Sequence, residues 1–236
     1  MPRASLGVPP IDVLSAATPD GLDFGALVCV RNKFLASIDA LIALRDDRAA
    51  CHAIAAAAGL LVRALKGGGR VFACGNGGSM CDAMHFAEEL SGRFRGDRRP
   101  LPAAAISDPA HLTCVANDYG YEQVFARYLL AQAGKGDVLV AITTSGRSAN
   151  ILAALQTAAS LDVERIALVG APGSPAAINA EVTIAVGGFP FADPVQELHI
   201  QVLHLLVQMC EQALFPAQPE RVRDPASSAP AAPAPR

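Results

Sequence analysis

The sequence predicts an α/β fold, a doubly wound parallel sheet in a flavodoxin-like three-layer sandwich with two N-terminal helices. Three observations support this prediction. Short apolar runs recur along the chain, and most are followed by a glycine or serine turn and then by apolar residues at helical spacing. Two segments with helical spacing precede the first such run. The 236 residues suffice for one domain with a substantial core.

Two helices are expected at the start of the domain. Residues 24–46 and 49–65 have apolar side chains at three- and four-residue spacing, and three glycines at 67–69 stop the second helix. The run HAIAAAAGLLVRALKGGG contains Arg63 and Lys66, and we expect it to be too short to span a bilayer. The chain is therefore expected to be soluble.

Five strands are expected after these helices, each ending in a turn signal and most followed by a helical pattern. Strands that alternate with helices are typical of a parallel sheet covered on both faces. The expected strands are RVFACG (70–75), PAAAIS (102–107), DVLVAIT (137–143), RIALVG (165–170) and EVTIAV (181–186).

A single domain is expected over residues 23–215. Residues 1–22 are rich in proline, glycine and serine, and residues 216–236 are of low complexity, rich in proline and alanine. Neither end has enough apolar side chains to bury, so we expect a flexible N-terminal tail and a disordered C-terminal tail.

The composition narrows the class of partner. The formal net charge is -3, so no basic surface dominates and we expect neither nucleic acid nor a membrane as a partner, whereas a small anion remains possible. The six cysteines lack CxxC spacing, and the N-terminus lacks the apolar segment of a signal peptide. A cytoplasmic location fits these features best.

Two loops at strand ends are candidates for binding an anion. In GNGGS (75–79), glycines allow a close approach of backbone N–H groups, and Asn76 and Ser79 add side-chain donors. The loop matches neither GxGxxG nor the Walker pattern. A plain strand-to-helix turn, with Ser79 as the helix N-cap, is an equal alternative.

The second loop, TTSGRSAN, has four hydroxyl side chains within six residues, on Thr143, Thr144, Ser145 and Ser148. One hydroxyl is enough to cap a helix, so four of them with a glycine favour an oxyanion site. Because ligands of open α/β sheets bind beyond the carboxyl ends of the strands, we expect both loops to form the site.

Histidines and carboxylates on two expected helices suggest a metal site. His85 and Glu89 are four residues apart and share a helix face, a spacing that can chelate a divalent ion but is more often a solvated contact. In the last helix, Gln196 and His204 are two turns apart on one face, whereas His199 points elsewhere. His204 lies among apolar residues, as core histidines do.

The basic run RFRGDRR, residues 93–99, adds positive charge after the first of these helices. Such runs are usually solvated surface, and we expect this one to lie outside the site.

Four stretches together resemble the phosphoheptose isomerases, the sedoheptulose 7-phosphate isomerases of the sugar-isomerase (SIS) domain family. The similarity covers about residues 25–215, with the motifs in the same order. They are GNGGSMCDAMHFAEELSGRF, ISDPAHLTCVANDYGYEQVFARY, TTSGRSAN and ADPVQELHIQVLH.

The resemblance implies a SIS-type fold, a homotetramer with active sites at subunit boundaries, and one divalent metal, zinc, per subunit. It also implies an intramolecular oxidoreductase that converts sedoheptulose 7-phosphate to D-glycero-D-manno-heptose 7-phosphate, as a step of heptose biosynthesis. By motif position, the catalytic pair would be Glu89 and His204; the metal ligands His85, Glu89, Gln196 and His204; and the substrate contacts Asn76, Gly77, Gly78, Glu89, Asn117, Asp118, Thr143, Thr144, Ser145, Ser148 and Gln196. Thr143 stands where serine is common and keeps the hydroxyl.

The chemistry of this reaction suits those residues. Aldose–ketose isomerisation moves a proton between C1 and C2 through an enediol, with Glu89 as the base and His204 as the acid. A divalent ion would stabilise the charge on the two oxygens. A metal-held carboxylate is a weaker base, however, and a metal-bound imidazole nitrogen cannot deliver a proton. Either these residues leave the metal during turnover, or the ion is partly structural.

The alternative is a SIS-fold protein that senses a phosphosugar or binds a replication initiator without catalysis. Such a protein needs the hydroxyl loop but has no use for Glu89 and His204. The presence of both residues favours the enzyme.

Overall fold

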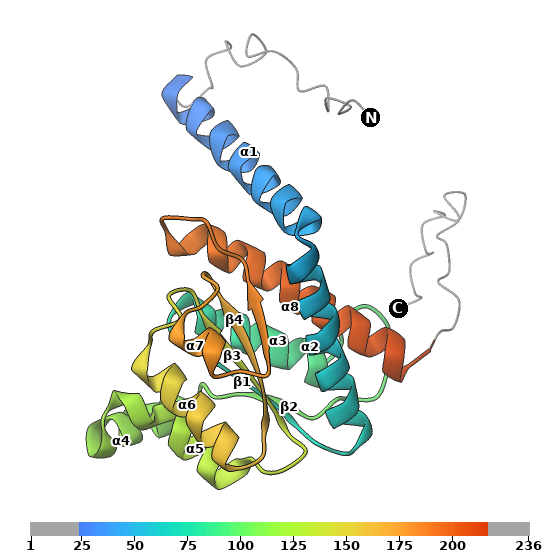
Figure 1. The fold of residues 1–236 in the computed structure, drawn as a ribbon, viewed down its shortest axis with the longest axis vertical. Coiled ribbons are helices and arrows are strands. Elements are labelled where there is room, and N and C mark those ends of the chain that lie inside the picture. The colour runs from blue at the N-terminus through green and yellow to red at the C-terminus, as the bar shows by residue number, and fades with distance from the viewer. Residues whose placement is uncertain (1–23, 217–236) are drawn as a thin grey trace, which may run out of the picture.

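The computed structural model describes residues 24–216, which form a five-stranded parallel sheet between two layers of helices (Figure 1). The strand order is β2-β1-β3-β4-β5, which confirms the predicted doubly wound sheet. The strands are β1 (Val71–Gly75), β2 (Ala103–Ala105), β3 (Val138–Thr143), β4 (Glu164–Val169) and β5 (Val182–Ala185). The predicted tails, 1–22 and 216–236, lie outside the described residues except for Pro216.

The helices follow the predicted alternation, and the two opening helices are confirmed. The helices are α1 (Phe24–Asp46), α2 (Arg48–Lys66), α3 (Gly78–Ser91), α4 (Pro109–Tyr119), the short 3₁₀ helix η2 (Tyr121–Gln123), α5 (Val124–Gln132), α6 (Ala149–Ser160), α7 (Pro175–Ile178) and α8 (Ala192–Leu214). Helices α2, α3 and α8 share a core with one face of the sheet, and α5 and α6 share a core with the other.

Strand β1 shows why the sheet needs both layers. All five of its residues are buried. Val71 and Ala73 belong to the core beneath α2, α3 and α8, whereas Phe72 and Cys74 belong to the core beneath α5 and α6. Successive side chains of a strand point to opposite faces, so a wholly apolar strand is stable only between two helical layers.

Helix α2 corrects one expectation about the sequence. Its 19 residues are long and apolar enough to cross a membrane by length and composition alone, so the expectation that this segment is too short was wrong. Eight of its residues are buried, and Ile54, Leu61 and Leu65 are among those in the main core. Asp47 caps its N-terminus by accepting a hydrogen bond from Ala50 N at 3.1 Å. In the fold, α2 packs as a core helix.

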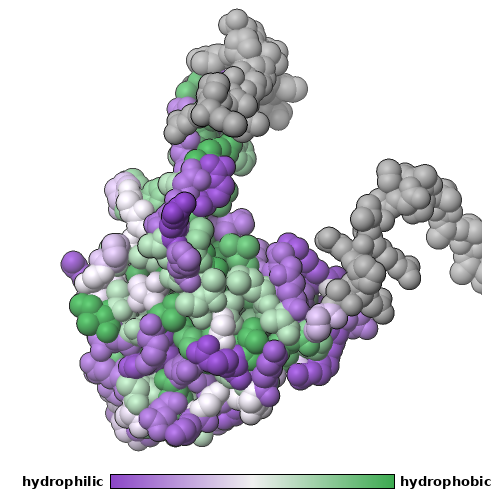
Figure 2. Space-filling model, turned by 45° about the vertical axis from the view of Figure 1, so that its right-hand side comes forward, coloured by the Kyte–Doolittle hydropathy of each residue, from purple (hydrophilic) through white to green (hydrophobic). Residues whose placement is uncertain are grey.

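Helix α1 projects from the body of the domain (Figure 1). Among the α1 residues whose burial is described, Ala40 alone is buried, and large apolar side chains such as Phe34 and Ile38 are exposed. The part of α1 visible in Figure 2 carries both hydrophobic and hydrophilic residues. Lys33 connects the helix to the start of α8 through Asp193, at 2.7 Å. The lone helix therefore leaves apolar surface uncovered.

Candidate active site

Three predicted metal ligands come together between α3 and α8. His85 Nε2 and His204 Nε2 are 2.9 Å apart, and Glu89 Oε1 is 3.5 Å from His85 Nε2. One ligand atom from each of the three residues lies within 4.8 Å of the others. The predicted i, i+4 pair on α3 therefore faces the histidine of α8, 119 residues further along the chain.

The two carboxylate oxygens of Glu89 have different surroundings. Oε1 lies beside His85, whereas Oε2 is buried and has no hydrogen-bond partner among the described residues. The side chain is 14% exposed. One turn before His85, Asp82 also has a buried oxygen without a partner in this part of the chain, and burial raises the pKa of Asp82, although His85 opposes this effect.

The cluster fits a divalent transition metal. Its donors are two imidazole nitrogens and one carboxylate oxygen, a set that zinc and related ions bind. The carboxylate oxygen that faces His85, Oε1, lies 3.5 Å from His85 Nε2, so it is the oxygen placed to join the two imidazoles as a ligand. Several divalent first-row transition metals accept this donor set.

Gln196, the fourth predicted metal ligand, lies beside the first turn of α3. Its amide atoms are 2.5–2.9 Å from where a Cβ of residue 78 would sit. Eight residues of helix, a rise of about 12 Å, separate the backbone of Gln196 from that of His204. Gln196 therefore lies beside the GNGGS loop, and its role as a metal ligand stays a prediction.

His199 lies five residues before His204 on α8, near the backbone of Val169. It is completely buried, and neither ring nitrogen has a hydrogen bond of normal geometry with a described residue. Burial lowers the pKa of His199 to about 4, although the nearby backbone of Val169 opposes this effect. The side chain is therefore a neutral imidazole at pH 7, buried beneath α8 near the backbone of Val169.

The GNGGS loop is a strand-to-helix turn that brings backbone donors to the site. Helix α3 begins at Gly78 with Gly77 in the cap position at φ 56°, so the alternative that Ser79 caps the helix is wrong. Ser79 is buried inside the first turn. The first N–H groups of a helix have no partner within it, and they form the positive end of the helix dipole.

A pair of asparagines joins the two candidate loops. Asn76 Nδ2 donates to Asn150 Oδ1 at 2.9 Å, and Asn150 Nδ2 donates to Asn76 Oδ1 at 2.8 Å. The Tyr121 hydroxyl also donates to Asn76 Oδ1, at 3.2 Å. Sequence reasoning missed Asn150 and Tyr121 as parts of this link. The one available signal for Asn150 was its place at the end of TTSGRSAN.

The hydroxyl loop follows β3 and leads into α6. Thr143 is buried, and its hydroxyl accepts a hydrogen bond from Gly146 N at 3.2 Å, so it holds the loop together. Ser148 is the N-cap residue of α6 but makes no capping hydrogen bond with its side chain. Ser145 is exposed. The hydroxyls of Ser145 and Ser148 are therefore better placed for a ligand than that of Thr143.

Asn117 and Asp118 lie in the last turn of α4, where both are exposed. Asn117 Nδ2 donates to Asp118 Oδ1 at 2.7 Å, and Cys114 Sγ is 3.7 Å from Asp118 Oδ2. These two predicted substrate contacts are near in sequence to Tyr121, which reaches the GNGGS loop.

One arginine of the basic run at 93–99 is not solvated. The side chain of Arg98 is only 4% exposed, so the expectation that the whole run lies on the surface was wrong for this residue. The reason is tertiary: Arg98 turns inward to bind backbone carbonyls at the end of α3 and Glu211 of α8.

Comparisons with known proteins agree with this architecture. Residues 33–170 match the family model described as SIS domain. A phosphoheptose isomerase from Sodalis glossinidius is 48% identical over 185 residues, which cover 78% of this chain and 95% of that protein. The solved phosphoheptose isomerase from Neisseria gonorrhoeae superposes with a TM-score of 0.73 at 34% identity, covering 79% of this chain and 99% of the other. The solved phosphoheptose isomerase from Francisella tularensis superposes with a TM-score of 0.74 at 36% identity, covering 79% of this chain and 98% of the other.

Proposed function

The chain belongs to the SIS domain family and to its phosphoheptose isomerases, and from this premise we propose that it converts sedoheptulose 7-phosphate to D-glycero-D-manno-heptose 7-phosphate. The observation that carries the proposal is the meeting of Glu89, His85 and His204 between α3 and α8, on the helix that starts at the GNGGS loop. His85 lies seven residues beyond Gly78, about 10 Å along the helix, so a sugar held at the cluster can also reach the GNGGS loop.

Glu89 acts as the base in this proposal. The carbon-bound proton has to pass between C1 and C2 of the sugar, and a carboxylate can accept it from one carbon and return it to the other. Glu89 Oε2 is buried and makes no hydrogen bond with a described residue, so its lone pairs remain available for this transfer. Oε1, which faces His85, is available for a metal. Because Oε2 would accept the proton and Oε1 would bind the metal, Glu89 could act as a base and as a ligand at the same time.

His85, Glu89, Gln196 and His204 would hold one divalent ion, which we propose to be zinc. When bound, the ion would polarise the sugar oxygens as a Lewis acid. His204 is also the proposed acid, and only a ring nitrogen that is free of metal can deliver a proton. Phe94 packs against the His204 ring, with centroids 5.8 Å apart, and restricts its orientation.

The phosphate is proposed to bind at the hydroxyl loop through Thr144, Ser145 and Ser148, with Thr143 supporting the loop from below. Hydroxyl and backbone donors bind a phosphate dianion without adding charge. Asn76, Gly77, Gly78, Asn117, Asp118 and Gln196 complete the proposed set of substrate contacts.

The proposal includes a cytoplasmic homotetramer whose sites lie at subunit boundaries. The apolar side chains of α1 that the single chain leaves exposed, Phe34 and Ile38 among them, support its role in an interface. All six cysteines are free thiols, which suits a reducing compartment.

The substitution Glu89→Gln tests the catalytic assignment. It keeps the shape and one possible metal-binding oxygen but removes the base, so kcat should fall about 100- to 10,000-fold, with a much smaller change in substrate affinity. NMR of the aldose product and calorimetry of substrate binding measure the two effects. A variant that still isomerises within a few-fold of wild type would refute the role of Glu89. A wild-type protein that binds the substrate without converting it would favour the sensing alternative.

A further inference from the structure

Arg98, in the loop between α3 and β2, caps the C-terminus of α3. Its Nη2 donates to Glu89 O at 2.6 Å and its Nη1 to Leu90 O at 2.8 Å, with longer contacts from Nη1 to Gly92 O and Arg99 O. The last carbonyls of a helix have no partner within it and carry partial negative charge. Helix α3 has no basic residue in its own last turn. Arg98 therefore supplies this positive charge from outside the helix.

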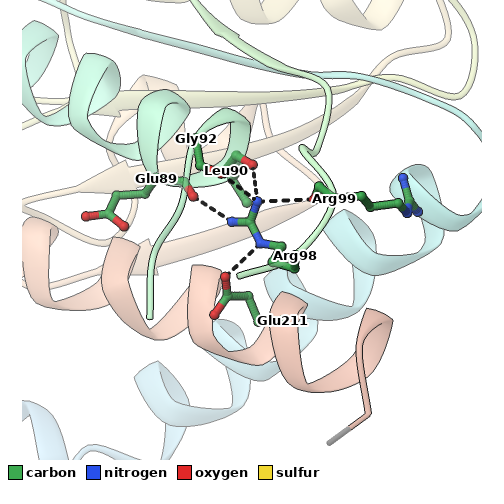
Figure 3. Close-up of polar contacts among 6 residues, drawn as sticks. All are labelled: Glu89, Leu90, Gly92, Arg98, Arg99 and Glu211. Carbon is green, nitrogen blue, oxygen red and sulfur yellow. Dashed lines mark hydrogen bonds and ion pairs between the residues drawn. The ribbon is translucent and has the colours of Figure 1, made fainter. Parts of the chain in front are cut away.

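The same guanidinium group also binds α8. Its Nε donates to Glu211 Oε1 at 2.7 Å, and the Glu211 side chain is only 15% exposed. Figure 3 shows Arg98 between the end of α3 and Glu211. Charge-assisted hydrogen bonds are stronger than neutral ones, and the planar fork of arginine can address several acceptors in fixed directions. One buried side chain thus joins the two helices.

These two helices carry the proposed metal ligands. Helix α3 bears His85 and Glu89, and α8 bears His204, two turns before Glu211. A slide of one helix along the other would separate the facing imidazole nitrogens, which are 2.9 Å apart. In Figure 3 the Glu89 carboxylate points away from Arg98, which binds only the backbone carbonyl of that residue. Arg98 can therefore act on the site only through the placement of the helices.

We infer that Arg98 is a positioning residue, which fixes α3 against α8 and so sets the distance of His204 from His85 and Glu89. The catalytic part of this inference rests on the proposed isomerase function, whereas the metal-binding part rests on the ligand cluster alone. Residues that orient metal ligands from outside typically contribute about 10- to 100-fold to metal affinity or activity. A misplacement of about 1 Å at a reacting group costs about 100-fold in rate.

The test uses the full-length protein and the variant Arg98→Met, which keeps an apolar stem but loses every hydrogen bond of the guanidinium group. We expect the affinity for Zn²⁺, measured by calorimetry on metal-free protein, and kcat for sedoheptulose 7-phosphate each to fall about 10- to 100-fold. KM should stay within about threefold, because Arg98 touches no side chain that is proposed to bind the substrate; of those residues it binds only Glu89, through the backbone carbonyl. Arg98→Lys restores the charge without the fork and should recover part of both losses.

The matched control is Arg99→Met. The Arg99 guanidinium lies over the Phe215 ring, 5.5 Å from its centroid, and its removal should leave zinc affinity and kcat at the wild-type level. A purely structural cap would lower the melting temperature of Arg98→Met but leave kcat and zinc affinity of the folded protein within about threefold of wild type. That result would overturn the inference.

A second variant covers the case in which Arg98→Met does not fold. Glu211→Leu keeps the cap on α3 and breaks only the bridge to α8, and it should lower zinc affinity and kcat by about tenfold. Wild-type values for both would overturn the inference. If wild-type protein fails to isomerise sedoheptulose 7-phosphate, the proposed function is refuted, but the zinc affinities of the variants still decide the role of Arg98.

Discussion

Acid should destabilise this protein through His199, and the size of the effect follows from the burial of that residue. The pKa of His199 is about 4 in the folded chain, compared with 6.5 for an unperturbed histidine. Above pH 6.5 the imidazole is neutral in both folded and unfolded chains, so it has no effect on the pH dependence. As the pH falls from 6.5 towards 4, His199 binds a proton in the unfolded chain but not in the folded chain, so the free energy of unfolding falls.

The magnitude is about 3 kcal/mol. Each tenfold difference in proton affinity corresponds to about 1.4 kcal/mol, and the difference between 6.5 and about 4 is expressed almost fully at pH 4. The substitution His199→Leu removes the titrating group and keeps the site apolar. Between pH 7 and pH 4, the free energy of unfolding of this variant should therefore fall by about 3 kcal/mol less than that of wild type.

Urea unfolding followed by circular dichroism measures this difference. It should be carried out at one protein concentration, because assembly affects apparent stability, and in chelator, so that pH-dependent metal binding does not contribute. The matched control is His52→Leu, which removes an exposed imidazole from α2. Equal losses of stability in wild type and His199→Leu between pH 7 and pH 4 would refute the reasoning.

Three further predictions concern the loops and the assembly. Asn150→Ala leaves the Asn76 amide without its buried partner and should lower the free energy of unfolding by about 1–3 kcal/mol in a denaturant titration; no change would show that the pair does not stabilise the fold. Ser145→Ala combined with Ser148→Ala should weaken substrate binding in calorimetry by about 1.5–3 kcal/mol per lost hydrogen bond, with kcat changed only a few-fold; unchanged affinity would place the phosphate elsewhere. Phe34→Lys puts a charge on the exposed face of α1 and should reduce the molar mass in light scattering, whereas an unchanged mass would exclude that face from the interface.

The order of elements and the shared face of His85 and Glu89 could be predicted because they depend on local spacing. Apolar runs followed by turns gave all five strands within two residues, and the helical period placed His85 and Glu89 on one face. The period also put Gln196 and His204 on one face of α8, but the distance from the Gln196 amide to the other predicted ligands depends on packing and not on the period. The contact of Gln196 with Gly78 depends on how α8 packs against α3.

Arg98 could not be predicted because its surroundings come from distant segments. In the sequence it is one of four arginines in a run of seven residues, and such runs are usually solvated. Its burial requires that the loop after α3 folds back over the helix end and that Glu211, 113 residues later, lies on the facing side of α8. Asn150 was missed for a similar reason, because its partner Asn76 is 74 residues away.

The separation of His85 and His204 by 119 residues also affects biosynthesis. At about 5–20 residues per second, a ribosome adds His204 roughly 6–24 s after His85. Throughout that interval the nascent chain has the α3 pair but lacks the histidine that faces it. High-affinity metal capture therefore has to wait until nearly the whole domain has been made. Loading with the proposed metal is then a late event in the synthesis of each polypeptide, and a chain that terminates before α8 has only two of the three residues of the cluster, His85 and Glu89.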